Sequence, residues 1–121
     1  MNTVDFTSLQ RAQEVAHLLN DKKAEKTVIL DLTDQKAFAD YTVISTALSG
    51  RQASALADYV CQYLKQKGIP PHVEGLEQCD WVLIDAGDVV VHIFKPDVRL
   101  FYNLEKMWGQ TKMDSHFPSN P

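Results

Sequence analysis

The chain has 121 residues, of which 45% are hydrophobic and 23% charged, close to the averages for soluble globular proteins, which argues against disorder and coiled-coil character. A chain of this length fits one ordinary domain with a buried core. Twelve Lys and Arg against 16 Asp and Glu leave a net charge of −4, which argues against binding nucleic acid along a broad basic surface.

The first part of the chain predicts a helix followed by two strands. Apolar residues recur at helical spacing over residues 8–23, with Asp5 just upstream. Two segments rich in β-branched residues, 26–31 and 41–46, then indicate strands. No glycine-rich hairpin sequence joins these two strands.

A second helix has the clearest boundaries in the sequence. Ser49 and Gln52 have the spacing of a capping box, in which each side chain bonds a free backbone N–H at the helix start. Gly68 suits the left-handed position after a helix, and Pro70-Pro71 prevents continuation, so we expect the helix to end near Lys67. Its apolar stripe consists of Ala53, Leu56, Ala57, Val60 and Leu64.

A hairpin is predicted after a short extended piece at residues 72–75. Its strands are 81–85 and 88–94, and a turn at Ala86-Gly87 pairs Trp81 with His92. One face is aliphatic and contains Val82, Ile84, Val89, Val91 and Ile93. The other face is mixed and contains Trp81, Leu83, Asp85, Asp88, Val90, His92 and Phe94. Because Ala suits a type I′ turn poorly, a bulge at Gly87 is the alternative, and it would shift the register by one residue.

The last predicted helix opens at Pro96-Asp97 and carries Phe101, Leu104 and Trp108 on one stripe. We expect a domain over residues 1–109 and a flexible tail over residues 110–121, which show no periodicity. The order of helices and strands predicts a single α/β (α+β) domain with a mixed β-sheet flanked by helices.

Acidic residues gather without basic ones in one window of the sequence. Residues 68–94 contain five Asp and Glu but no Lys or Arg. Protein surfaces usually intersperse both signs, so this window indicates an acidic patch and a basic partner, with a chance run as the alternative.

Nothing in the sequence indicates export or a membrane span. The N-terminus lacks a basic segment followed by an apolar one, and no run approaches the ~18 apolar residues that span a bilayer. Cys61 and Cys79 have no CxxC relation and are too few for a disulfide framework. We therefore expect a cytoplasmic protein with reduced thiols.

The signals for catalytic chemistry are weak. Ser49-Gly50 opens a helix after a strand, as in the phosphate sites of nucleotidyltransferases, but the chain has no Asp-x-Asp or Asp-x-Glu pair for metal ions. Asp85 and Asp88 have a spacing suited to an acid and base pair or a metal, although Asp is also common beside turns. No second His, Cys or acidic residue lies at a metal-ligand spacing from His92, which favours a role for His92 as a hydrogen-bonding residue of an interface. We expect no catalytic residue, cofactor or metal.

The mixed face of the predicted hairpin has the composition of a protein-binding site. Trp81, His92 and Phe94 gather there with Leu83 and Val90, bordered by acids. Buried aromatic anchors with a charged rim are typical of protein interfaces, and this rim favours a basic partner. The alternative is that the terminal helix or a second subunit covers these residues.

Six blocks of the sequence resemble the ribosomal silencing factor family, also called RsfS or Iojap. The blocks are residues 40–46, 49–52, 73–75, 80–85, 87–94 and 99–108, and the match covers roughly residues 8–109. The chain departs from the family at Gly50, where a second Ser or Thr is usual, and in the tail after Gly109.

The resemblance implies a binding protein with a nucleotidyltransferase-like fold that lacks the catalytic carboxylates. Family members form homodimers and bind the fourteenth ribosomal protein of the large subunit, with little direct RNA contact. They thereby block joining of the small subunit and repress translation, notably under nutrient limitation. Matching positions assign the ribosomal contact to Glu74, Trp81, Asp85, His92, Tyr102 and Glu105. The secondary candidates are Arg51, Asp88, Phe94 and Arg99.

Three functions stay open at this point. The leading one is silencing by steric blocking of subunit joining. The others are a metal-dependent nucleotidyltransferase and, since organelle members of the family assist assembly, an adaptor for the maturing large subunit.

Overall fold

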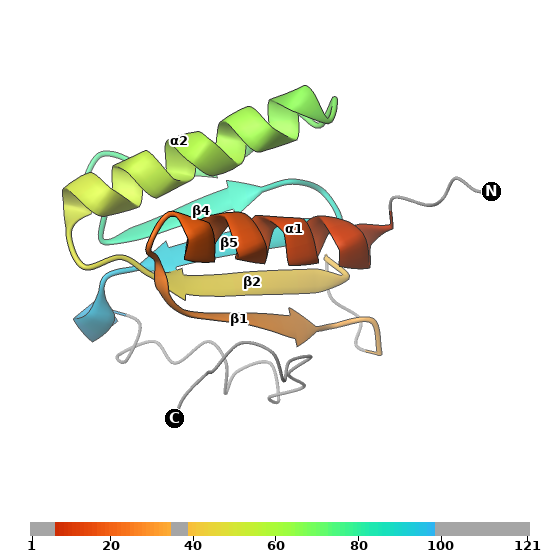
Figure 1. The fold of residues 1–121 in the computed structure, drawn as a ribbon, viewed down its shortest axis with the longest axis horizontal. Coiled ribbons are helices and arrows are strands. Elements are labelled where there is room, and N and C mark those ends of the chain that lie inside the picture. Colours follow the sequence, from red (N-terminus) through yellow and green to blue (C-terminus); the bar gives the residue numbers. More distant parts are fainter. Residues whose placement is uncertain (1–6, 35–38, 99–121) are drawn as a thin grey trace.

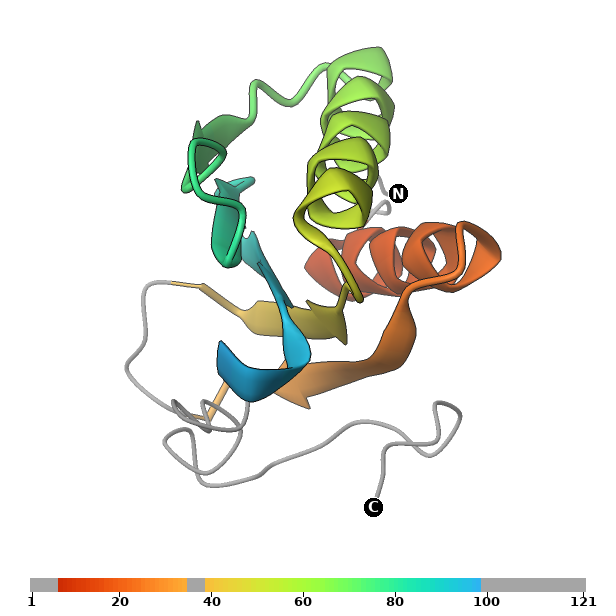
Figure 2. The ribbon, with the colours of Figure 1, turned by 90° about the vertical axis from the view of Figure 1, so that its left-hand side faces the viewer.

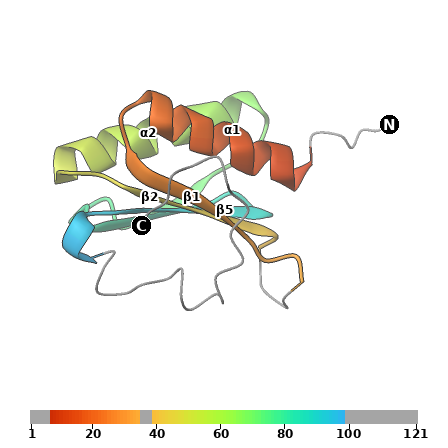
Figure 3. The same ribbon diagram turned by 60° about the horizontal axis from the view of Figure 1, so that its bottom comes forward.

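One mixed β-sheet and two long helices make up residues 7–34 and 39–98, the part of the chain that the computed structural model describes (Figure 1). The sheet has the strand order β1-β2-β5-β4-β3, and both helices lie on the same face of it (Figures 2 and 3). The elements are α1 (Ser8–Asp21), β1 (Glu25–Asp31), β2 (Tyr41–Thr46), α2 (Gly50–Gln66), β3 (His72–Glu74), β4 (Trp81–Asp85) and β5 (Val89–Phe94). The predicted α+β domain with a mixed sheet is confirmed. Residues 96–98 begin the last predicted helix, and the rest of that helix and the tail lie outside the described residues.

The helix α1 begins with a capping box and ends in a Schellman motif. The hydroxyl of Thr7 accepts a hydrogen bond from the Gln10 N–H (3.1 Å), and the Thr7 N–H donates to Gln10 Oε1 (3.0 Å). At the other end Lys23 has a positive φ of 76°, and the next N–H bonds the carbonyl of Leu19 (2.9 Å). These caps end the helix two residues before its predicted end. The residues buried against the sheet are Ala12, Val15, Ala16 and Leu19.

The helix α2 has the predicted stripe, but its predicted capping box forms only in half. The Ser49 hydroxyl accepts from the Gln52 N–H (3.1 Å), as expected. The Gln52 side chain does not return to Ser49: its Oε1 accepts from the Leu48 N–H (2.7 Å), and its Nε2 donates to the Lys23 carbonyl (3.2 Å). The amide therefore joins the start of α2 to the end of α1. The buried stripe is Ala53, Leu56, Ala57, Val60 and Leu64, as predicted.

The C-terminus of α2 also confirms the sequence pattern. Gly68 has a positive φ of 78°, and the Ile69 N–H bonds the carbonyl of Leu64 (2.9 Å), which completes a Schellman motif. Neither α2 nor any other helix in the described ranges is long and apolar enough to cross a membrane. Cys61 and Cys79 are free thiols.

A parallel pairing of β2 with β5 joins two antiparallel parts of the sheet. On one side β1 pairs with β2, and on the other side β5, β4 and β3 follow one another, all antiparallel. Most strand residues that face the helices are aliphatic and buried, namely Ile29, Val43, Val82, Ile84, Val89, Val91 and Ile93. They form the main core and confirm the aliphatic face predicted for the hairpin.

The hairpin of β4 and β5 has a different register from the predicted one. Its strand residues nevertheless lie on the predicted faces of the sheet. Trp81 pairs with Phe94, and not with His92 as predicted. The reason is that Gly87 (φ 81°) is the first residue of the two-residue turn and not the second. The partner of each β4 residue therefore moves by two positions, which leaves every strand side chain on its side of the sheet. The strand β5 also begins one residue later than predicted, so Asp88 belongs to the turn.

A second, smaller hydrophobic cluster lies on the sheet face opposite the helices. It consists of Val28, Leu30, Leu32, Ile44 and Phe94, with the partly buried Trp81 and Val98 against it. Each of the five central residues is at most 2% exposed. The strands β1 and β2 are therefore buried on both faces, which accounts for their nearly continuous apolar sequence.

Candidate protein-binding surface

The strand register sets the composition of the sheet face opposite the helices. Paired residues on neighbouring strands project to the same side, so rows of side chains cross this face. The middle row runs from β1 to β3 through Val28, Ile44, His92, Leu83 and Glu74. The rows beside it contain Thr46, Phe94 and Trp81, and Leu30, Thr42, Val90, Asp85 and His72. The face is buried over β1 and β2 and becomes exposed toward β3.

We call the part of this face over β3, β4 and β5 the aromatic face. Its members are His72, Glu74, Trp81, Leu83, Asp85, Val90, His92 and Phe94. Trp81, Leu83, Val90 and His92 are partly exposed, whereas the three members nearest the β3 edge are exposed. Of the predicted contact residues, the structure thus gathers Glu74, Trp81, Asp85, His92 and Phe94 on one surface.

Three rings at the centre of the aromatic face contact one another. The Trp81 indole Nε1–H donates a hydrogen bond to His92 Nδ1 (2.9 Å). The ring centroids of Trp81 and Phe94 are 4.9 Å apart, and the rings of His92 and Phe94 stack with an interplanar angle of 5° and a centroid distance of 5.9 Å. Phe94 is fully buried and belongs to the smaller hydrophobic cluster, so it packs beneath the other two rings on the same sheet face.

The imidazole of His92 is held neutral. Burial lowers its pKa from 6.5 to about 4, because the charged form loses hydration. Its Nδ1 accepts the indole hydrogen bond, which places the proton of the neutral ring on Nε2. Neutral imidazole therefore serves as a hydrogen-bond acceptor here and contributes no positive charge to the face.

Carboxylates border the aromatic rings. Glu74 lies at the β3 edge, 3.6 Å from His72 Nε2, with its side chain 64% exposed. Asp85 accepts a hydrogen bond from the Gly87 N–H (2.9 Å), which also helps to hold the hairpin turn. Such an arrangement of partly exposed aromatic rings beside exposed acids is suited to contact with a basic protein surface.

A pocket of about 600 Å³ opens beside Trp81. Its lining residues are Gly75, Glu77, Gln78, Asp80, Trp81, Asp97 and Val98. Gly75 is required at its edge, since its φ is +92° and a Cβ there would overlap the backbone carbonyl of Trp81. Asp80 pairs with Lys95 across 3.2 Å, which joins this loop to the end of β5. The pocket thus extends the aromatic face toward the residues that follow β5.

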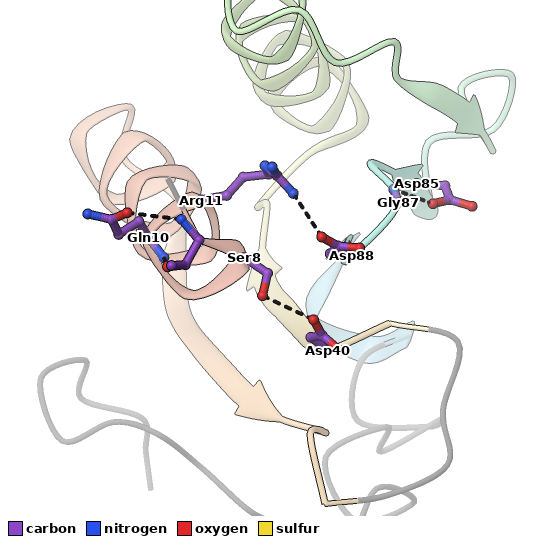
Figure 4. A network of polar contacts seen from close by, with 8 residues as sticks. Ser8, Gln10, Arg11, Asp40, Asp85, Gly87 and Asp88 are labelled. Carbon is purple, nitrogen blue, oxygen red and sulfur yellow. Dashed lines mark hydrogen bonds and ion pairs between the residues drawn. The ribbon is translucent and has the colours of Figure 1, made fainter. Parts of the chain in front are cut away.

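Asp88, a secondary candidate on the predicted mixed face, lies elsewhere. Its carboxylate is 3.6 Å from the guanidinium of Arg11 on α1, close to the hydrogen bond between Ser8 and Asp40 (Figure 4). Because α1 covers the opposite sheet face, this ion pair directs Asp88 toward the helices. The prediction that Asp88 shares a face with Trp81 is wrong for this reason.

Arg51, another secondary candidate, lies in the first turn of α2 on the helical side of the sheet. It lines a second pocket of about 500 Å³ together with Ser54, Ala55, Ala57, Asp58, Cys61 and Leu76. The structure does not bring Arg51 to the aromatic face. The remaining predicted contacts, Arg99, Tyr102 and Glu105, lie outside the described residues.

Two contributors to this surface were not predicted. His72 shares a row with Asp85, and its position two residues before Glu74 is the signal, because alternate strand residues face the same side. Lys95 holds the loop beside Trp81 through Asp80, a contact that no sequence spacing indicates. Both residues carry polar groups to the border of the aromatic face.

The features considered for catalysis have other roles in the described part of the chain. Ser49 is the N-cap of α2. Asp85 and Asp88 bond different partners, the Gly87 N–H and Arg11. Within residues 7–34 and 39–98, no three His, Cys, Asp or Glu side chains gather closely enough to hold a metal ion.

The sequence and the fold both match known proteins. A family model described as "Ribosomal silencing factor during starvation" matches residues 5–120. The ribosomal silencing factor RsfS of Zymomonas mobilis is 39% identical over 109 residues, covering 89% of this chain and 82% of that protein. RsfS of Halalkalibacterium halodurans is 43% identical over 98 residues, covering 80% and 84%. A crystal structure of a Chromobacterium violaceum protein superposes with a TM-score of 0.80 at 35% identity, covering 93% of this chain and 96% of that one.

A relative from an organelle is also similar. The mouse protein named "Mitochondrial assembly of ribosomal large subunit protein 1" is 30% identical over 101 residues, which make up 80% of this chain and 44% of that protein. Since the family model covers nearly the whole chain and the bacterial matches span most of each protein, this chain belongs to the ribosomal silencing factor (RsfS) family.

Proposed function

We propose that this protein silences ribosomes by binding the large subunit through its fourteenth ribosomal protein. The bound protein sterically prevents the small subunit from joining and so represses translation, especially under nutrient limitation. It acts in the cytoplasm as a homodimer and catalyses no reaction. Family membership supports the ribosomal role, and the observation that carries the binding mode is the aromatic face with its acidic border.

The chemistry of the aromatic face supports a basic protein as the partner. Trp81 is partly exposed and backed by the buried Phe94, which is the setting of an interface anchor. Glu74 and Asp85 lie exposed around it and complement positive charge. The net charge of −4 disfavours extensive contact with RNA phosphates. The protein therefore docks on ribosomal protein first and contacts RNA little.

Sucrose-gradient sedimentation of mixed ribosomal subunits tests this proposal. We expect the protein to reduce the fraction of whole ribosomes and to co-sediment with large subunits. Trp81→Ala should abolish co-sedimentation, and Glu74→Lys should weaken it strongly by placing a cation against a basic partner. Asp58→Lys is the matched control, because Asp58 lies exposed on α2 in the helical layer. Retained binding in both face variants, with the fold intact, would contradict the assigned surface.

A second candidate function is that of an adaptor in large-subunit assembly. The name of the mouse relative, which states mitochondrial assembly of the ribosomal large subunit, favours it. The same aromatic face would then bind an immature particle. Cells without the protein should in that case accumulate large-subunit precursors while purified subunits join normally, whereas silencing predicts normal precursors and altered joining during starvation.

A further inference from the structure

We propose that His92 is a positioning residue for binding, which fixes the indole of Trp81 in the orientation that meets the partner. The inference rests on the proposed function, because it assigns a role within the same surface. It differs from direct contact, the role that family resemblance gives to His92. The distinction matters because the two roles predict different effects of substitution.

The geometry around Trp81 restricts its ring on two sides. An indole has one N–H donor, and that donor is bonded to His92 Nδ1 at 2.9 Å. Phe94 is the cross-strand partner of Trp81, with ring centroids 4.9 Å apart. His92 is the diagonal neighbour, two residues before Phe94 on the same strand, within reach of a large side chain. The indole is thus held by a ring contact at one side and a hydrogen bond at its nitrogen.

Histidine suits this position because it combines an acceptor with a flat ring. Its plane lies within 5° of that of Phe94, so the imidazole stacks on the buried ring while Nδ1 points at the indole. The low pKa of about 4 keeps the imidazole neutral at neutral pH, and the indole hydrogen bond favours the tautomer in which Nδ1 is the acceptor. Leucine fills a similar volume at this position but has no hydrogen-bond acceptor.

A fixed indole benefits binding because less side-chain freedom is lost when the complex forms. The single N–H is already bonded to His92, so a partner meets the indole through ring contacts and not through a hydrogen bond to its nitrogen. A partner group that packs on an aromatic ring, such as an apolar side chain or the stem of a basic one, fits this surface. Loss of the hydrogen bond should therefore weaken binding without removing any atom that touches the partner.

The test compares His92→Leu, which removes the acceptor, with His92→Asn, which retains an oxygen acceptor on a short side chain. Affinity for purified large subunits is measured by co-sedimentation at neutral pH, and the indole N–H of Trp81 is followed by NMR, its signal being assigned by its absence in Trp81→Phe. We expect His92→Leu to weaken binding about 3- to 10-fold and to expose the indole N–H to fast hydrogen exchange. His92→Asn should restore most of the affinity and the protection of the N–H.

A double-mutant cycle separates positioning from contact. In a Trp81→Phe background no N–H remains to be positioned, so His92→Leu should cause no further loss. Equal losses in His92→Leu and His92→Asn, or a full additional loss in the Trp81→Phe background, would overturn the inference. So would wild-type affinity in His92→Leu while Trp81→Ala abolishes binding, a result that leaves the proposed function intact. If Trp81→Ala itself binds normally, the assigned surface and this inference both fail.

Discussion

The side chain of His92 lies at the boundary between the buried and exposed halves of one sheet face. Its neighbours in the same row are Ile44 on β2 and Leu83 on β4, and both are apolar. Glu74, the acid in that row, is separated from it by Leu83. The imidazole therefore has little compensation for a positive charge, and burial accounts for its low pKa.

This environment makes the stability of the protein depend on pH through His92. The unfolded chain takes up the proton near pH 6.5, whereas the folded chain takes it up only near pH 4. Between these values the unfolded state binds more protons, so the free energy of unfolding falls as the pH is lowered from 6.5 to 4. The lowered pKa corresponds to at most about 3 kcal/mol. Urea unfolding at pH 7 and pH 4 should show a smaller difference for His92→Asn than for the wild-type chain, and equal differences would contradict the assigned environment.

Single residues also mark the limits of sequence prediction. Trp81, Asp85 and His92 could be placed on one face because strand alternation is local and regular. Glu74 joins them through the pairing of β3 with β4, which alternation within one strand does not indicate. Asp88 could not be placed from alternation, since its orientation depends on Arg11, which lies far away in the sequence on α1. The half-formed capping box has the same origin, because the Gln52 amide bonds the distant Lys23 carbonyl instead of completing the cap.

At the scale of elements, the loop between β3 and β4 is held by backbone geometry that only glycine adopts without strain. Gly75 has a φ of +92°, and its α-carbon faces the Trp81 carbonyl. The Cys79 N–H bonds the Gly75 carbonyl (2.9 Å), which closes the loop just before β4. This loop therefore sets the position at which Trp81 enters the sheet.

Replacement of this glycine should destabilise the protein more than replacement of another glycine in the same conformation. Gly68→Ala is the matched control, because Gly68 also has a positive φ (78°) but no atom within 4 Å of the added Cβ. We expect a loss of about 1 kcal/mol for Gly68→Ala from the left-handed conformation alone. Gly75→Ala should lower the free energy of unfolding clearly more than Gly68→Ala does, since the loop must also move away from the Trp81 carbonyl. Urea unfolding measures both, and equal losses would show that the loop relaxes freely.

Element boundaries were predictable where a periodic pattern met a capping signal. The apolar stripe of α2, its N-cap at Ser49 and its end before Gly68 all follow from the sequence. The hairpin register was not predictable, because Gly87 fits either central position of a turn and only the packed strands choose between them. The strand residues of the hairpin still lie on their predicted faces, because the register differs from the predicted one by an even number of residues.

At the scale of the whole molecule, the two faces of the sheet differ in composition and in what covers them. The helices and the main core occupy one face, and the other is apolar at β1 and β2 and acidic at β3. No local pattern indicates the second cluster, since it forms only when strands from both halves of the sequence lie side by side. The exposed carboxylates of the aromatic face, Glu74 and Asp85, consequently lie toward its β3 edge.

This arrangement predicts that binding to the large subunit depends on salt through the association rate. Exposed acids steer a basic partner over about 10 Å at 0.1 M salt, and higher salt screens that attraction. Raising the salt from about 50 mM to about 300 mM should slow association while changing dissociation less. The variant with Glu74→Gln and Asp85→Asn together should show a weaker salt dependence, as measured by stopped-flow or biosensor kinetics. An unchanged salt dependence would mean that other charges steer the encounter.

The parallel pairing at the centre of the sheet also determines when the surface becomes available during synthesis. The strand β2 emerges early, but its parallel neighbour β5 follows only after α2, β3 and β4 have been made. Until then β2 has an unpaired edge, and the long chain segment between the two strands must close before the sheet is complete. Trp81 and His92 come from the later half, so a partly synthesised chain has no aromatic face.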